Sequence, residues 1–231
     1  MNELMAMPAP PPMMPPMPMP MQSPNTGKVR TGLLIAGIGL LLGAFVGFGG
    51  FGFIGGLIFV VGGAIMLGGL KSYPNARGMA LAGFGLALGG FVLSLVAWVM
   101  TPSLFLLVAP TDPIAYLNAV VTGLLIGFVA SLLLWIGVIL MGMKLMTGSA
   151  KGLAIAGGVL GLLGAIIFLA MVYTAFAAML AAVAGGGTFD VNTLIAAAIG
   201  ILLGALMSFI GSLLAGIGYI IGRNKIVPAT M

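Results

Sequence analysis

The side chains of this sequence that could carry out chemistry are few. Cysteine and histidine are absent, which removes thiolate chemistry, disulfides and the commonest acid–base and metal-binding side chains. Two of the three acidic residues, Asp112 and Asp190, stand immediately before long apolar stretches. An aspartate there could attract cations at the mouth of a pore, or it could cap the free N–H groups of a helix. Because Pro113 suits the first turn of a helix, we expect Asp112 and Asp190 to be helix caps.

Hydroxyl, amide and thioether groups remain, and none of them completes a reactive site. The polar residues within the apolar stretches are Ser94, Asn118, Thr122, Tyr173 and Thr174, and such groups usually join membrane helices by hydrogen bonds. A methionine run could offer thioethers to Cu(I), but its sequence is of low complexity and no histidine supports it. The run comprises Met17, Met19 and Met21. We therefore predict no catalytic residue, no cofactor site and no metal site, and we expect the protein not to be an enzyme.

The composition places these groups in a membrane. Apolar residues make up 61% of the 231 positions and charged residues 5%, whereas a soluble domain has about a quarter charged residues. The mean hydropathy is +1.31. In hydrocarbon every backbone polar group must be hydrogen-bonded within the protein, and the lack of alternating hydrophobicity favours helices over a β-barrel. We therefore predict an all-α integral membrane protein with the lipid bilayer as its surroundings.

Clusters of charge divide the apolar sequence into three blocks, which comprise residues 30–71, 77–144 and 151–223. A helix needs about 20 residues to cross the hydrocarbon, so each block is long enough for two helices. Turn sequences rich in glycine or proline separate the two halves of each block. We therefore predict six helices, over residues 31–46, 53–70, 78–100, 113–143, 152–184 and 191–222. Together they form a six-helix transmembrane bundle, residues 28–231, built as three parallel helical hairpins.

The lysines and arginines give this bundle an orientation. All eight fall on one side of a six-span arrangement, and the intervening turns have none: Lys28, Arg30, Lys71, Arg77, Lys144, Lys151, Arg223 and Lys225. Positive residues favour the cytoplasmic side, so both termini are predicted to be cytoplasmic. The cations lie in four small groups rather than along one face, so the net charge of +5 does not indicate nucleic-acid binding. No charged residue lies inside a predicted span, so proton relay and charge-coupled transport lack their essential group.

Small residues recur at every fourth position in four of the predicted helices. Such rows let helix backbones approach closely in a membrane. We assign the following residues to helix packing: Gly39, Gly43, Gly47, Gly123, Gly127, Ser131, Ala170, Thr174, Ala178, Ala182, Ala196, Gly200, Gly204, Ser208, Ser212 and Gly216. The six successive members in the last helix favour a packing interface over a general abundance of glycine and alanine.

Residues 1–27 differ from the rest of the chain. They contain nine of the fourteen prolines and eight of the eighteen methionines. Proline at this density favours the extended polyproline II conformation and excludes helix. We therefore predict an extended arm that docks on a protein partner.

A basic residue followed by a glycine- and alanine-rich step begins several of the apolar stretches. Two examples are Lys151-Gly-Leu-Ala-Ile-Ala-Gly157 and Arg77-Gly-Met-Ala-Leu-Ala-Gly83. With its proline-rich arm, the sequence resembles a group of uncharacterised glycine-rich prokaryotic and viral multi-span membrane proteins, a family of unknown function. The resemblance implies the cell membrane of a prokaryote or a virion membrane, and it implies no catalytic activity.

Packing signals without chemical groups predict a structural or accessory membrane protein. We expect it to assemble with itself as a homo-oligomer, or with other subunits of a membrane complex, through its small-residue helix faces. A passive channel or an uncoupled transporter is the alternative, because Ser208 and Ser212 place hydroxyl groups in the last helix.

Overall fold

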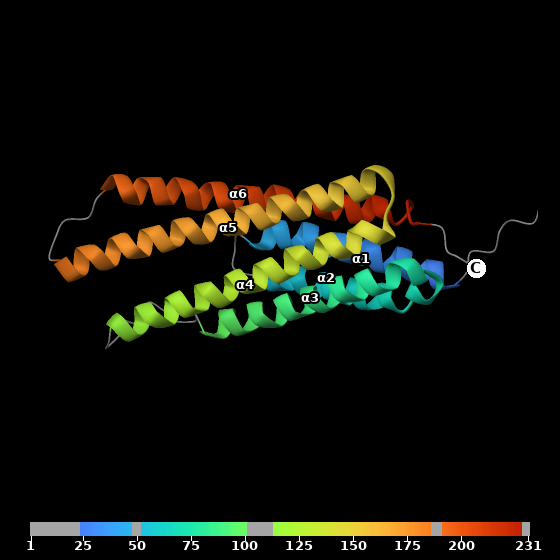
Figure 1. Cartoon of the computed structure of the whole chain (residues 1–231), viewed down its shortest axis with the longest axis horizontal. Coiled ribbons are helices and arrows are strands. Elements are labelled where there is room, and N and C mark those ends of the chain that lie inside the picture. The colour runs from blue at the N-terminus through green and yellow to red at the C-terminus, as the bar shows by residue number, and fades with distance from the viewer. Residues whose placement is uncertain (1–23, 48–51, 101–112, 186–190, 228–231) are drawn as a thin grey trace, which may run out of the picture.

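The computed structural model describes residues 24–47, 52–100, 113–185 and 191–227. These residues form six α-helices and one short 3-10 helix, and they contain no β-strand (Figure 1). The helices are α1 (Pro24–Gly47), α2 (Gly52–Leu67), α3 (Pro74–Met100), α4 (Pro113–Leu145), α5 (Gly148–Gly185) and α6 (Val191–Gly222), and η1 (Leu70–Ser72) lies between α2 and α3. The predicted all-α class is therefore confirmed.

The observed helix boundaries differ from the predicted ones mainly near the lysines and arginines. α1 begins at Pro24, seven residues before the predicted start at residue 31, because proline needs no hydrogen-bond partner for an N–H in the first helical turn. Residues 24–27, which the sequence assigned to the extended arm, are thus helical. α2 ends at Leu67 rather than at residue 70, and the Gly69 N–H donates to the Met66 carbonyl, 2.9 Å away, in the turn that follows.

Five of the described helices are long and apolar enough to cross a membrane, and their candidate spans are Asn25–Phe45, Pro74–Met100, Val120–Leu145, Gly148–Met179 and Val191–Gly222. α2 is the exception, with 16 residues, or about 24 Å of helix against a hydrocarbon core of about 30 Å. α2 is thus shorter than the predicted helix over residues 53–70, and its crossing of the membrane stays a prediction. Large apolar side chains face outward on each of the five long helices, for example Ile38, Leu88, Leu125, Val159 and Leu202. The chain is a multi-pass helical membrane protein.

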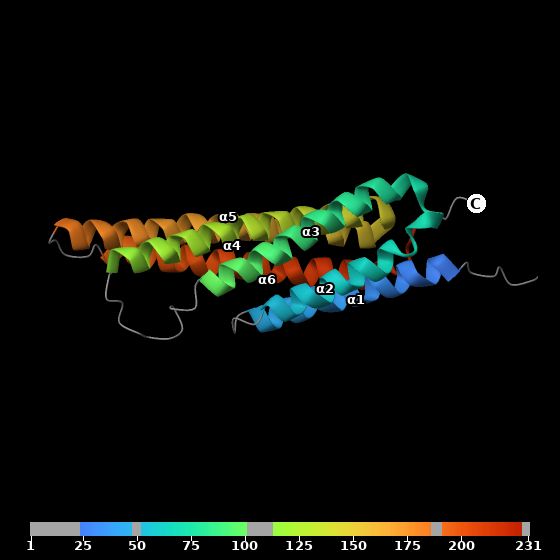
Figure 2. The same ribbon diagram turned by 90° about the horizontal axis from the view of Figure 1, so that it is seen from below.

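The helices pack in the order of the sequence. The pairs α1 with α2, α3 with α4 and α5 with α6 make the most extensive contacts. Smaller contacts join α2 to α3, α4 to α5 and α6 to α1, so that the series of neighbours closes on itself. At one end of the bundle α4, α5 and α6 extend beyond the ends of α1 and α2 (Figures 1 and 2).

Glycine and alanine rows bring α5 and α6 into backbone contact. A Cβ atom added at Gly157 would meet the backbone of Ala215, and one added at Gly204 would lie 2.7 Å from the Phe168 nitrogen. The row on α5 comprises Ala150, Ala154, Gly157, Gly161 and Gly164, and the facing row on α6 comprises Gly204, Ser208, Gly211, Ala215 and Gly218. Both rows alternate steps of four and three residues, which is the spacing of a coiled-coil seam.

The other two pairs repeat this arrangement. Between α1 and α2, the Gly39 and Gly62 positions leave no room for a side chain, because each lies against the backbone of the opposite helix. Between α3 and α4, Gly83 and Gly137 face each other's carbonyl groups in the same way. Dispersion and weak hydrogen bonds at these close approaches replace the hydrophobic drive that helices lack in lipid.

Larger side chains fill the half of the bundle near the first residues of α1. Tyr219 of α6 is fully buried, and its hydroxyl donates a 2.7 Å hydrogen bond to the Val138 carbonyl of α4. The ring of Tyr219 packs edge-on against Phe59 of α2, with 5.9 Å between the ring centroids. Trp135 is 6% exposed and lies against Gly161 of α5. This aromatic cluster joins α2, α4, α5 and α6.

Candidate functional site

All eight cations lie at one end of the bundle, which we call the basic end. It contains the first turns of α1, α3 and α5, the ends of α2, α4 and α6, and η1 (Figures 1 and 2). Polar contacts tie these segments together: the Asn25 amide donates to the Ser72 hydroxyl over 3.0 Å, and the Lys225 ammonium donates to the Ser149 hydroxyl over 2.8 Å. The cations are Lys28, Arg30, Lys71, Arg77, Lys144, Lys151, Arg223 and Lys225.

The two predicted helix caps, Asp112 and Asp190, lie outside the described residues. α4 begins at Pro113 and α6 at Val191, each the residue that follows one of these aspartates. The caps therefore stay predictions. α4 and α6 begin at the end of the bundle opposite the cations, which we call the far end.

Several residues assigned to helix packing lie against another helix of the same chain. Gly39 and Gly43 of α1 face Gly55 and Phe59 of α2. A Cβ atom added at Gly127 of α4 would lie 3.7 Å from the Cβ of Ala97 in α3. Gly123 is buried. The surroundings of Gly47 and the side chain of Ala182 lie outside the described part of the structure.

The predicted row of α5 faces outward rather than into the bundle. Ala170 and Thr174 are exposed, and Ala178 is half-buried. The Thr174 hydroxyl donates to the Ala170 carbonyl of its own helix over 2.9 Å. This hydrogen bond satisfies the hydroxyl without a second helix.

The predicted row of α6 contacts different neighbours along its length. A step of four residues turns the direction of a side chain by about 40° around the helix, so a row of six turns by about 200°. Gly200 and Gly204 accordingly face α5, while Gly216 faces Gly37 and Leu41 of α1. Ser208 lies against Gly164 of α5 and, with Ser212, also lines a cavity, and Ala196 is exposed.

The predicted rows have a fixed interval of four residues, so they include only part of the rows that hold the pairs together, such as Gly39 and Gly43 of α1 and Gly204 and Ser208 of α6. The signal that could have found them is the alternation of four and three. In α5 this alternation runs from Ala154 through Gly157 and Gly161 to Gly164, and in α3 from Gly83 through Ala87 to Gly90. Such a row stays on one face over several turns, so it can follow one partner helix.

One row with the same alternation has no neighbour within the described residues. It lies on α3 and comprises Gly78, Ala82, Gly85 and Gly89. A Cβ atom added at Gly78, Gly85 or Gly89 would have no described atom within 4 Å, and Ala82 is exposed. We call it the open α3 row.

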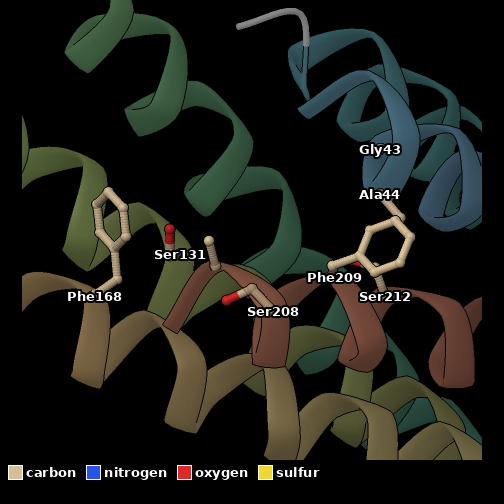
Figure 3. Close-up of a pocket in the computed structure, with 8 residues that line it drawn as sticks. Gly43, Ala44, Ser131, Phe168, Ser208, Phe209 and Ser212 are labelled. Carbon is tan, nitrogen blue, oxygen red and sulfur yellow. The ribbon is translucent and has the colours of Figure 1, made fainter. Parts of the chain in front are cut away.

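A cavity of about 510 Å³ lies where α1 ends and α4, α5 and α6 continue toward the far end (Figure 3). Its wall includes the hydroxyl-bearing side chains Ser131, Ser208 and Ser212, with the rings of Phe168 and Phe209 on opposite sides. Gly43, Ala44 and Ala205 complete the lining. A second pocket of about 290 Å³ between α4 and α5 shares Ser131 and Phe168 with it.

The lining of this cavity is polar but uncharged. The Ser131 hydroxyl donates to the Gly127 carbonyl, 2.9 Å away within α4, and no lysine, arginine, aspartate or glutamate is among the lining residues. A volume of this size is typical of sites for small molecules. Hydroxyl groups in apolar surroundings suit neutral groups that form hydrogen bonds, and they offer no group for proton transfer. The chain matches no protein-family model, no curated protein and no solved structure.

Proposed function

We propose that the protein is a structural or accessory multi-pass membrane protein that assembles with itself or with partner subunits through a small-residue helix face. It would insert as three parallel helical hairpins with both termini on the cytoplasmic side, in the cell membrane of a prokaryote or in a virion membrane. The one-sided distribution of the eight cations supports this orientation, because positive residues are retained on the cytoplasmic side.

The open α3 row is the observation that carries the proposal. Rows of this spacing hold α3 to α4 and α5 to α6 by backbone approach, and the open α3 row offers the same surface with nothing from the described residues against it. In a membrane a small-residue row gains dispersion contacts when a second helix covers it. A second copy inserted in the same direction would present its own α3 in parallel, so that one patch could pair with itself about a two-fold axis.

The test is a substitution in the full-length protein, Gly85→Leu, which puts a large side chain in the middle of the open α3 row. The matched control is Gly152→Leu on α5, since a Cβ atom at Gly152 also has no described atom within 4 Å. After mild solubilisation, blue-native electrophoresis should show an assembly for the wild type and for Gly152→Leu, and a monomer for Gly85→Leu. A wild-type protein that runs only as a lone monomer would contradict the proposal.

The proposed role of residues 1–27 is to tether a protein partner. Its support is the proline and methionine composition of this segment, because extended proline-rich segments dock with little loss of conformational entropy. Deletion of residues 2–20 should leave insertion unchanged and should remove a copurifying protein, which mass spectrometry of the purified complex would detect.

The second candidate function is a passive channel or an uncoupled transporter, and the cavity with three serines favours it. The cavity lies between the aromatic cluster and the far end. In the aromatic cluster, Tyr219 and Phe59 fill the space between the helices. A path across the bundle would therefore require these rings to move. Flux of a small neutral solute into liposomes that contain the purified protein, abolished by Ser208→Leu, would favour this candidate over a purely structural role.

A further inference from the structure

A separate pocket of about 440 Å³ lies at the basic end, between the beginning of α3 and the turn that joins α4 to α5. The charged groups in its lining are Lys144, in the last turn of α4, and Lys151, in the first turn of α5. The polar side chains Asn75 and Thr147 also line it. The pocket therefore combines two cations with hydrogen-bonding groups from three helices and one turn.

No carboxylate of the described residues balances these two lysines. The chain has three acidic residues, Glu3, Asp112 and Asp190, and all three lie outside the described ranges. Another cation lies close by, because the Lys225 ammonium donates to the Ser149 hydroxyl beside the pocket. The described surroundings of the pocket thus favour an anion.

The backbone around the pocket favours the same sign of charge. Both α3 and α5 begin at its lining residues, Pro74 and Gly148, and the first turn of a helix carries partial positive charge. α4 ends there with the opposite partial charge, which Lys144 in its last turn compensates.

The position and the apolar part of the lining identify the source of the anion. The apolar spans of α3 and α5 begin at this pocket and that of α4 ends there, so it lies at the level where a bilayer changes from hydrocarbon to headgroups. Met143, Met146 and Val227 form its apolar wall. Basic pockets between membrane helices at this level suit phosphate headgroups.

We propose that this pocket binds the phosphate of an anionic lipid headgroup, with Lys144 and Lys151 as its charged ligands and with the lipid chains lying along α3 to α5. The ligand group is a phosphate diester, which carries one negative charge. The continuity of the pocket with the apolar spans favours a membrane lipid over a soluble phosphate compound.

The experiment uses the full-length protein and compares binding of phosphatidylglycerol with that of phosphatidylcholine by native mass spectrometry. The wild type should prefer phosphatidylglycerol. In the double variant Lys144→Gln/Lys151→Gln, the ratio of phosphatidylglycerol binding to phosphatidylcholine binding should fall about fivefold for each lysine removed. The matched control is Lys28→Gln/Lys71→Gln, which removes the same charge from the same end, away from the pocket. This control should retain most of the preference.

Three results would overturn the proposal. An equal loss in the control variant would assign the preference to the general charge of the basic end. Competition by inorganic phosphate or glycerol phosphate at millimolar concentration would assign the pocket to a soluble anion. Failure of Lys144→Arg/Lys151→Arg to preserve the preference would show that positive charge at these positions is not the cause. The thermal transition of each variant in phosphatidylcholine alone reports whether the variant is folded. If the glutamine variant does not fold, the arginine variant and the competition by soluble phosphate test the lipid site instead.

Discussion

Gly157 and Gly152 lie five residues apart in α5 and have opposite surroundings. A Cβ atom at Gly157 would overlap the backbone of Ala215 in α6, whereas one at Gly152 would have no described atom within 4 Å. Neither glycine has a positive φ angle, since Gly148 is the described glycine with that conformation. The difference between the two positions is therefore one of space and not of backbone conformation.

The substitution Gly157→Ala should destabilise the protein, and Gly152→Ala should not. Alanine gains about 1 kcal/mol over glycine from helix propensity at either position, but added volume in a closely packed contact costs about 1–3 kcal/mol. We expect a lower midpoint of thermal unfolding in detergent for Gly157→Ala and an unchanged or higher midpoint for Gly152→Ala. Equal midpoints for the two variants would show that α5 and α6 are not held by this close approach.

At the scale of the element, α6 is longer than the membrane requires. Its 32 residues, Val191–Gly222, extend about 48 Å, compared with about 30 Å of hydrocarbon. Its beginning reaches beyond the ends of α1 and α2 (Figures 1 and 2). Val191 and Leu206 are both exposed on its surface, 62% and 48% respectively, so protein packing does not shield either of them.

Single cysteines at these two positions should therefore differ in their reaction with a membrane-impermeant maleimide. Because the chain has no cysteine of its own, each variant carries one thiol. We expect Val191→Cys to react from the far end of the bundle, and Leu206→Cys, about 22 Å further along the helix, to be protected by lipid. Protection at both positions would mean that α6 tilts until its whole length lies in the bilayer. Reaction at both would mean that water reaches the middle of α6.

The helices could be predicted from the sequence because glycine- and proline-rich turns interrupt otherwise continuous apolar stretches. α6 was predicted with its observed bounds, residues 191–222. The contacts between helices could not be predicted equally well, because a chain with 39 glycines allows small-residue rows to be drawn at several spacings. The row through Ser208 and Ser212 is predicted to be one packing face, but its rotation around α6 separates it into a part against α5, a cavity wall and a part against α1.

At the scale of the whole molecule, the eight cations and the far end give the bundle a polarity. The basic end is also where the chain segments are joined by hydrogen bonds outside the helices: the Thr147 N–H donates to the Lys225 carbonyl over 2.9 Å, and the Val227 N–H donates to the Leu145 carbonyl over 3.1 Å. Moving one turn of this end across the bilayer would break these contacts and would carry lysine or arginine through hydrocarbon.

Three turns of the basic end are then expected to face one compartment, and single cysteines at Ser72, Ser149 and Asn224 test this. They follow α2, begin α5 and follow α6 respectively, so they report on three separate crossings of the chain. All three should react with an impermeant maleimide only after the cell membrane is permeabilised, because the cations beside them favour the cytoplasmic side. A cysteine that reacts in intact cells while the other two do not would mean that the number of crossings between them is odd. Ser72 and Ser149 are separated by α3 and α4, and Ser149 and Asn224 by α5 and α6. Agreement of all three labels would therefore mean that each of these two pairs of helices crosses the bilayer an even number of times.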